Sequence, residues 1–295
     1  WMWLAAFFGM ATIFAEATLA QVFRARDAHG QIMGGPAFYI SRGLNNKPLA
    51  AFFAVSIIIA LGFIGNMVQA NSIADGFHKA FEIPQWATGI FVFAIAGFIF
   101  IGGVRRIASF AEKMVPLMAV VYILGSLTII FSNYDMILPA FKEIIVGAFE
   151  PSAATGGIIG ASLKEAIRYG VARGLFSNEA GMGSTPHAHA LAQVKHPCEQ
   201  GLVAYVGLFF DTFIVLNMTP LVILTTGVLD GKSTGIVLTQ AAFTAGLGDI
   251  GPGFVAICLF FFAFTTIVGW YFFGEQNVKY LLGLRWVQSY RVLVL

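Results

Sequence analysis

Three carboxamides gather in the run from Gly65 to Ser72, near the end of an apolar stretch. Asn66 and Gln69 are three positions apart, so a helix places them on one face. An unpaired carboxamide in hydrocarbon is costly, and Gln69 offers both a donor and an acceptor, which suit the carboxylate and the ammonium of an amino acid. The alternative is that these amides join neighbouring helices. We interpret Asn66 and Gln69 as candidate binding residues.

Two adjacent threonines, Thr265 and Thr266, precede Trp270 in another apolar stretch. Thr266 and Trp270 are four positions apart and share one helical face. Neighbouring hydroxyls offer oxygen ligands to a small hard cation such as sodium, and the Trp270 ring could wall a pocket for a short side chain. The alternative is that the threonines bond to their own helix while Trp270 lies at the membrane interface.

Glycine interrupts a third apolar stretch, in which Gly156, Gly157 and Gly160 precede Ser162. Each glycine weakens a helix by about 1 kcal/mol relative to alanine. A glycine-interrupted span is the sequence sign of a broken helix at a transporter's binding site. Close packing of small residues between helices is the alternative. We expect this span to be discontinuous near residues 156–162.

Two ionisable residues, Glu16 and Asp211, fall at membrane depth, where such residues are rare. Either could carry a proton or anchor a hydrogen-bond network, and we favour the structural role. His187 and His189 are two positions apart and point to different helix faces. The sequence contains no His-Glu-x-x-His, cysteine-pair or Gly-x-Ser-x-Gly motif. Metal binding by histidines or cysteines and hydrolysis are therefore not predicted.

Composition shows what kind of scaffold positions these residues. The chain has 295 residues, of which 58% are hydrophobic and 11% are charged, with a mean hydropathy of +0.81. Soluble domains carry about 25% charged residues. Such a chain cannot cover itself with a polar surface, so its solvent is lipid. The net charge of +2 gives no reason to expect nucleic acid as a partner.

Stretches of about 20 mostly apolar residues predict membrane-spanning helices. The predicted spans are residues 1–23, 48–73, 86–104, 110–131, 152–173, 199–226 and 253–273, with an eighth starting near Trp286. Because both ends fall in apolar runs, we expect the sequence to be a piece of a longer protein.

Lysine and arginine are distributed unevenly between the two sides of this arrangement. Residues 24–47, 105–113, 164–197 and 279–291 hold 14 of the 17 basic residues. Since cytoplasmic loops are enriched in lysine and arginine, this side is predicted to be cytoplasmic.

Four motifs in order along the chain resemble one family, the alanine-or-glycine:cation (sodium:alanine) symporters of the amino acid–polyamine–organocation superfamily. The motifs are Gly34-Gly35-Pro36 with its following aromatic pair, the carboxamide run at 65–72, the run from Arg173 to Ser184, and the segment from Phe264 to Glu275. The third is long and specific, whereas the first alone is weak.

The resemblance implies an all-α bundle with two inverted five-helix repeats (LeuT-type) that works by alternating access. It implies sodium-coupled symport of a small neutral amino acid, alanine or glycine, across the cell (inner) membrane. No enzymatic activity and no cofactor other than the coupling ion are expected. Residues 1–295 would form one transporter domain without the first helix of the first repeat and the C-terminal helices.

By motif position, the resemblance implies particular site residues. The substrate contacts would be Gln69, Asn66, Thr266, Trp270, Gly160 and Ser162, and the sodium ligands would be Thr265 and Thr266. Proton coupling remains an alternative to sodium. A membrane-embedded enzyme or an ion channel is less favoured, because the sequence has no nucleophile–base pair and no filter-like repeat.

Overall fold

The computed structural model describes residues 1–28, 30–150 and 163–295, and most of these residues are helical. The strands are β1 (Ala25–Arg26) and β2 (Ile32–Met33), which pair antiparallel with Ala25 opposite Met33. The helices before the undescribed segment are α1 (Met2–Val22), α2 (Pro36–Gly43), α3 (Lys47–Ile57), η1 (Ile58–Gly65), α4 (Asn66–Phe81), α5 (Gln85–Ile101), α6 (Gly103–Ser132), η2 (Tyr134–Met136) and α7 (Ile137–Phe149). Those after it are α9 (Leu163–Asn178), α10 (Pro186–His189), α11 (Pro197–Phe210), η3 (Asp211–Val215), α12 (Leu216–Thr226), α13 (Gly235–Leu247), η4 (Gly248–Ile250), α14 (Gly251–Leu282), η5 (Leu284–Trp286) and α15 (Val287–Val294).

The structure confirms a multi-pass membrane protein. Among the described residues, five helical stretches are long and apolar enough to cross a bilayer: Met2–Val22, Lys47–Phe81, Gly103–Ser132, Pro197–Thr226 and Gly235–Leu282. Each corresponds to one predicted span. The span predicted at 86–104 corresponds to α5, a shorter apolar helix. Of the span predicted at 152–173, residues 152–162 lie outside the described part of the chain.

Three features differ from the sequence-based prediction. Residues 105–113 were expected to form a loop, but they are the first turns of α6, which follows α5 directly after Gly102. The short helices α7 and α13 were not predicted. Helix α14 continues to Leu282 rather than ending near residue 273, because its polar C-terminal third is buried among other helices instead of facing water.

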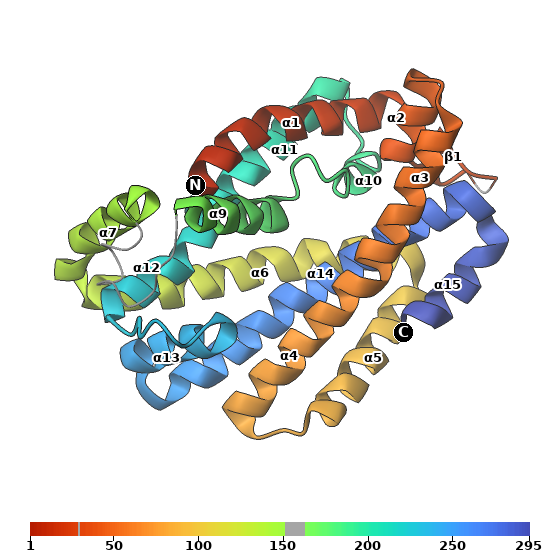
Figure 1. Cartoon of the computed structure of the whole chain (residues 1–295). Helices are drawn as coiled ribbons and strands as arrows, with labels where there is room; N and C mark the ends of the chain where they lie inside the picture. The colour runs from red at the N-terminus through yellow and green to blue at the C-terminus, as the bar shows by residue number, and fades with distance from the viewer. Residues whose placement is uncertain (29, 151–162) are drawn as a thin grey trace.

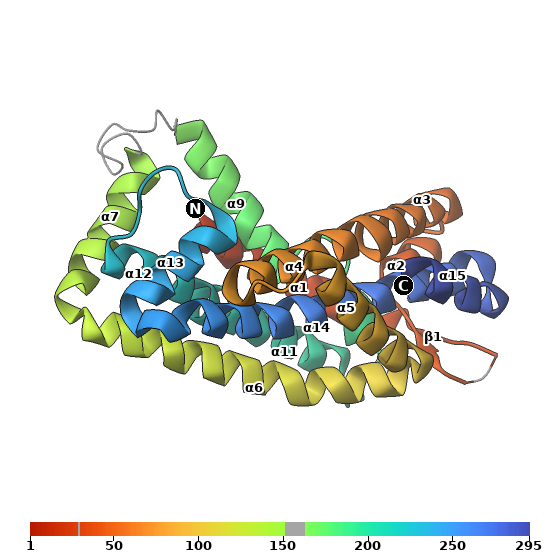
Figure 2. The same ribbon diagram turned by 90° about the horizontal axis from the view of Figure 1, so that it is seen from below.

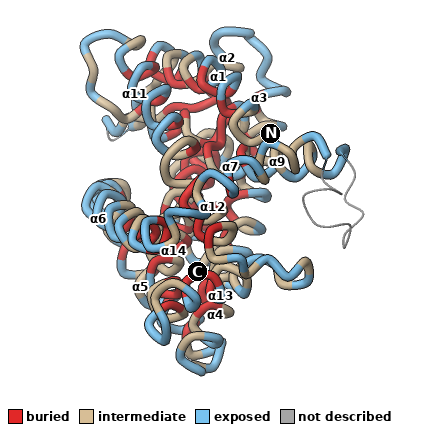
Figure 3. Tube along the Cα trace, turned by 90° about the vertical axis from the view of Figure 1, so that its left-hand side faces the viewer, coloured by how far each residue is buried: buried red, intermediate tan, exposed pale blue. Residues whose placement is uncertain are grey.

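The helices form two groups that face each other. Figures 1 and 2 show α1 running alongside α11, with α9 beside them, while α14 runs alongside α4 through the other group, next to α5, α6 and α13. Buried residues (red in Figure 3) follow α14 and the α1–α11 pair. Separate clusters of buried hydrophobic residues accompany α14 with α4 and α5, α14 with α6, α12 and α13, and α1 with α11.

Two long helices contain π-helical turns. Segment η1 joins α3 to α4, and η3 joins α11 to α12, without interrupting either helix. Such turns insert an extra residue into the helix and are frequent at functional sites. Here η1 directly precedes Asn66 at the start of α4, and η3 directly precedes Leu216 at the start of α12.

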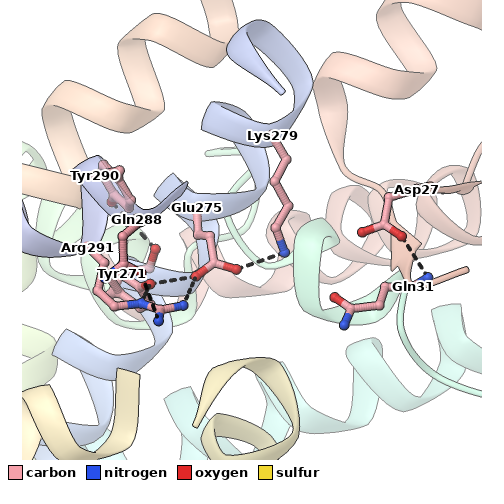
Figure 4. A network of polar contacts seen from close by, with 8 residues as sticks. All are labelled: Asp27, Gln31, Tyr271, Glu275, Lys279, Gln288, Tyr290 and Arg291. Atoms are coloured by element: carbon pink, nitrogen blue, oxygen red, sulfur yellow. Dashed lines mark hydrogen bonds and ion pairs between the residues drawn. The ribbon is translucent and has the colours of Figure 1, made fainter. Parts of the chain in front are cut away.

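A buried ionic network ties α15 to the C-terminal part of α14 (Figure 4). Glu275 accepts a hydrogen bond from the hydroxyl of Tyr271 at 2.5 Å and pairs with the Lys279 ammonium at 2.8 Å. Arg291 donates to the Tyr271 hydroxyl at 3.2 Å and lies 4.0 Å from Glu275. Because buried charges are tolerated only when paired, these contacts fix α15 against α14.

The aromatic ring of Tyr290 on α15 inserts between two glycines. A Cβ built on Gly62 would lie 2.4 Å from the Tyr290 hydroxyl oxygen, and one built on Gly274 would lie 1.9 Å from it. The hydroxyl donates to the Tyr271 carbonyl at 3.4 Å. Both glycines are therefore required for η1, α14 and α15 to approach one another.

We expect Gly274→Ala to lower the free energy of unfolding by about 1–3 kcal/mol, since the added methyl must displace Tyr290. Thermal unfolding of the purified full-length protein in detergent measures this. Gly269 on the same helix has open space where a Cβ would stand, so Gly269→Ala should leave the melting temperature unchanged or slightly higher. Equal melting temperatures for the two variants would contradict this packing.

Candidate functional site

A cavity of about 770 Å³ lies between the two groups of helices, within the size range of small-molecule sites. It is lined from α1, α4, α6, α9, η3, α12, α13 and α14. Its polar or ionisable lining residues are Gln69, Ser72, Asp75, Tyr122, Arg173, Ser177, Glu179, Asp211, Thr219, Thr239, Cys258, Thr266 and Trp270. Segments far apart in the sequence thus meet around one space.

The structure separates the two carboxamides that were expected to act together. Gln69 on α4 is partly exposed and lines the cavity, as expected of a binding residue. Asn66 is buried and is not among the cavity-lining residues. Its amide nitrogen donates to the Gly62 carbonyl at 3.1 Å, and its oxygen has no hydrogen-bond partner within the described ranges. The Asn66 side chain is therefore bonded to the backbone of η1, which contains Gly62.

Helix α14 brings Thr266 and Trp270 to the cavity, as the spacing of four residues predicts. Thr266 donates its hydroxyl hydrogen to the Phe262 carbonyl at 2.9 Å, and its oxygen retains acceptor capacity. Thr265 is not a lining residue. Its hydroxyl is 2.9 Å from the Phe261 and Phe262 carbonyls and 3.8 Å from the Met118 sulfur, because neighbouring residues on a regular helix point about 100° apart.

The indole of Trp270 is held from several sides. Its Nε1 donates to the carboxylate of Glu179 at 2.5 Å. The ring of Phe176 meets it edge-on, with centroids 5.6 Å apart. A Cβ built on Gly65 would lie 2.4 Å from the ring, so only glycine fits there. These contacts come from α9, its following turn and η1, and they fix one face of the cavity.

Asp211 lies in η3 at the cavity wall. Both carboxylate oxygens accept hydrogen bonds from the Ser177 hydroxyl, at 3.0 and 2.9 Å. Asn178 donates to the neighbouring Thr212 hydroxyl at 3.3 Å. Asp211 therefore joins α9 to η3, in keeping with the structural role that we favour, and it also exposes a carboxylate to the cavity.

Glu16 supports the turn that follows α9. Its carboxylate accepts a hydrogen bond from the Gly181 amide at 3.0 Å, within a turn where Glu179, Gly181 and Gly183 all have positive φ. This contact anchors the specific run from Arg173 to Ser184 onto α1 and supports the structural interpretation of Glu16.

The Gly34-Gly35-Pro36 motif packs on His187, in the loop region expected to be cytoplasmic. A Cβ on Gly34 would lie 2.3 Å from that of Ala190, and one on Gly35 would lie 2.5 Å from the His187 ring. Nδ1 of His187 lies 2.7 Å from the Ser184 carbonyl, and Nε2 lies 2.8 Å from the Asn277 amide nitrogen. Since the carbonyl can only accept, Nδ1 carries the proton and Nε2 accepts from Asn277.

This neutral histidine predicts a pH dependence of stability. Burial lowers the pKa of His187 to about 4, and that of His189 similarly, whereas an unfolded histidine titrates near 6.5. The unfolded state binds more protons between these values, so the free energy of unfolding falls as pH drops below about 6.5. Between pH 6.5 and 5 each histidine contributes a loss of up to about 2 kcal/mol.

The melting temperature measured from pH 7 to pH 5 tests this expectation. His187→Gln should reduce the slope with pH, because it removes one of the two titrating groups. His78→Gln is a matched control, since the His78 ring is exposed, and it should keep the wild-type slope. Identical slopes for all three proteins would contradict a buried, neutral His187.

Sequence reasoning gave no binding role to several residues at the cavity. Glu179 belongs to the run from Arg173 to Ser184, from which only the family resemblance is inferred. No individual role is predicted for Ser72, Asp75, Ser177 or Tyr122. For Glu179 the available signal was an acidic residue next to an Ala-Gly turn in a hydrophobic chain. The expected site residues Gly160 and Ser162 lie outside the described residues.

The fold and the cavity define a class: a multi-pass, mostly helical membrane protein with a ligand-sized cavity of mixed polarity between its helices. The particular family follows from the sequence profile of the sodium:alanine symporter family, which matches residues 1–295. The chain belongs to that family. It is therefore a member of a transporter family of the cell membrane and not of an enzyme family.

Several relatives support this assignment. The chain is 45% identical over 295 residues to an uncharacterized transporter of Haemophilus influenzae, covering 99% of the chain and 65% of that protein. It is 44% identical over 295 residues to a putative sodium/proton-dependent alanine carrier, YrbD, of Bacillus subtilis, covering 95% and 60%. It is 41% identical over 300 residues to the sodium/alanine symporter AgcS of Methanococcus maripaludis, covering 99% and 65%. The chain thus spans 60–65% of the length of these relatives.

Proposed function

We propose that the full-length protein carries a small neutral amino acid, alanine or glycine, into the cell together with sodium. One observation carries this proposal: Gln69, Thr266 and Trp270 come from helices far apart in the sequence and line the same cavity. Family membership and the sodium/alanine symporter of Methanococcus maripaludis support the choice of ligands.

The charges around the cavity favour cations. Among the described lining residues, Asp75, Glu179 and Asp211 are acidic and Arg173 is basic. With all four groups ionised, this set carries a net charge of −2, which raises the local concentration of cations. This negative potential would attract sodium and the ammonium group of an amino acid, whereas it would repel an anionic substrate.

We assign separate roles to the lining residues. The Gln69 amide would bind the charged groups of the amino acid, and Trp270 would limit the length of its side chain. The Thr266 hydroxyl oxygen would be a sodium ligand, because Thr266 lines the cavity and its hydroxyl, which donates to Phe262, retains acceptor capacity. Thr265 would join it as a ligand after a change of rotamer, because in the present conformation its hydroxyl bonds to α14 and faces Met118. Asn66 would support Gln69 through η1.

We further propose the architecture that the resemblance implies: residues 1–295 as one domain of a LeuT-type bundle with inverted repeats and alternating access. A break in the span around residues 156–162, with Gly160 and Ser162 facing substrate, belongs to this proposal. Coupling arises if the ion completes the amino-acid site, so that each ligand tightens the other by the same factor.

Uptake of labelled alanine by the full-length protein in proteoliposomes tests the proposal. An inward sodium gradient should drive accumulation above equilibrium, and replacing sodium with potassium or choline should abolish it. Accumulation that ignores sodium but collapses with a protonophore would instead establish proton coupling, which the name of the Bacillus subtilis relative YrbD makes the second candidate. No alanine uptake under either gradient would overturn the proposed function.

A further inference from the structure

We propose that Glu179 determines substrate size selectivity by positioning the Trp270 ring. The inference rests on the proposed function, because it assumes that Trp270 bounds the substrate side chain. In this account Glu179 is a positioning residue: it acts through Trp270, and a change in it alters which amino acids are accepted.

The two carboxylate oxygens of Glu179 have separate partners. Oε1 accepts from the Trp270 indole at 2.5 Å, and Oε2 accepts from the Ser184 hydroxyl at 2.5 Å. The Glu179 residue is 9% exposed and Trp270 is 2% exposed. A buried carboxylate with a donor on each oxygen cannot rotate without losing one bond, so the position of the indole nitrogen is fixed.

The backbone around Glu179 is equally constrained. Glu179 has φ 54 directly after α9, and its amide donates to the Leu175 carbonyl at 2.9 Å. The next turn is tied to α1 by the bond from Gly181 to Glu16. The carboxylate is therefore presented to α14 from a turn that is held at both ends.

Other contacts restrict the orientation of the Trp270 ring. Phe176 meets its edge with ring planes at 89°, and the backbone of Gly65 leaves no room on the opposite helix. If the indole nitrogen loses its acceptor, a buried donor is left unsatisfied, which favours other rotamers. Since Trp270 lines the cavity, such rotamers change the space that a substrate side chain can fill.

Two conservative variants separate positioning from charge. Glu179→Gln keeps the length of the side chain, an oxygen to accept from Trp270 and an amide to donate to the Ser184 oxygen, but removes the charge. Glu179→Asp keeps the charge but is one methylene shorter, so it cannot hold both partners at 2.5 Å. If positioning matters, the Asp variant changes selectivity and the Gln variant does not.

The test uses full-length protein in proteoliposomes and competition of alanine, methionine and leucine against labelled alanine under a sodium gradient. We expect Glu179→Asp to raise the apparent affinity for leucine relative to that for alanine by about tenfold. This is the scale of one hydrogen bond to a charged group. Glu179→Gln should stay within about threefold of the wild-type ratio. In a Trp270→Phe background, which lacks the indole donor, Glu179→Asp should add no further change, since residues that act through each other are not additive.

Three outcomes would overturn the inference. The first is a wild-type leucine-to-alanine ratio in Glu179→Asp. The second is the same change in Glu179→Gln as in Glu179→Asp, with weaker sodium dependence in both, which would assign Glu179 to cation binding. The third is an equal effect of Glu179→Asp with and without the indole donor. Failure of the proposed function is distinguishable, because the wild-type protein itself would then show no sodium-driven alanine uptake.

Discussion

Replacing Gln69 with alanine is expected to raise the apparent half-saturation constant for alanine uptake by roughly 10- to 150-fold. Gln69 on α4 lines the cavity, and losing a hydrogen bond to a charged ligand costs about 1.5–3 kcal/mol. Concentration dependence of sodium-driven alanine uptake by the full-length protein measures this change.

The neighbouring Val68 supplies a matched control for Gln69. It lies one residue away on α4, is 52% exposed and does not line the cavity. Val68→Ala should therefore keep the wild-type half-saturation constant for alanine. Wild-type kinetics in Gln69→Ala would remove Gln69 from the site, and equal losses in both variants would indicate a general effect on α4.

Replacing Trp270 with alanine is expected to admit larger amino acids such as leucine and methionine. The buried indole stands one helical turn from Thr266 at the cavity wall, and removing it enlarges the space beside the bound ligand. Each methylene accommodated in an apolar pocket is worth about 1–3 kcal/mol, so acceptance of leucine relative to alanine should rise by tenfold or more. Trp270→Phe should have a smaller effect in the same direction.

Competition of unlabelled amino acids against labelled alanine tests the prediction for Trp270. Trp286, which is 52% exposed, is the matched tryptophan, and Trp286→Ala should keep the wild-type substrate range. An unchanged range in Trp270→Ala would show that this ring anchors α14 instead of bounding the substrate.

The helical faces of the candidate site were predictable in part. The spacing of Thr266 and Trp270 placed both on one face of α14, and both line the cavity. Asn66 and Gln69 both belong to α4, yet only Gln69 lines the cavity, whereas the amide of buried Asn66 bonds back to Gly62. Residues three positions apart on an α-helix point about 60° apart, so at the edge of a cavity one of them can line it while the other is buried.

Contacts between segments that are far apart in the chain could not be predicted from the sequence. Glu179 and Trp270 are 91 residues apart, and no local pattern indicates that a turn after one helix holds a ring on another. The full length of α14 was also missed, since Glu275 and Lys279 read as a polar end of a span. They are buried because each charge has a partner. Hydropathy values are assigned to single residues, so they do not indicate which charges will form ion pairs in the fold.

The most direct test of the central claim is the reciprocal effect of sodium and alanine on each other's binding to the purified full-length protein. If both ligands share this cavity, saturating sodium lowers the alanine dissociation constant, and saturating alanine lowers that of sodium by the same factor. We expect a factor of about 5–150 in the wild-type protein, the usual range of coupling between sites, with weaker alanine binding in Gln69→Ala at every sodium concentration. An alanine dissociation constant that does not depend on sodium, or that Gln69→Ala leaves unchanged, would contradict the account.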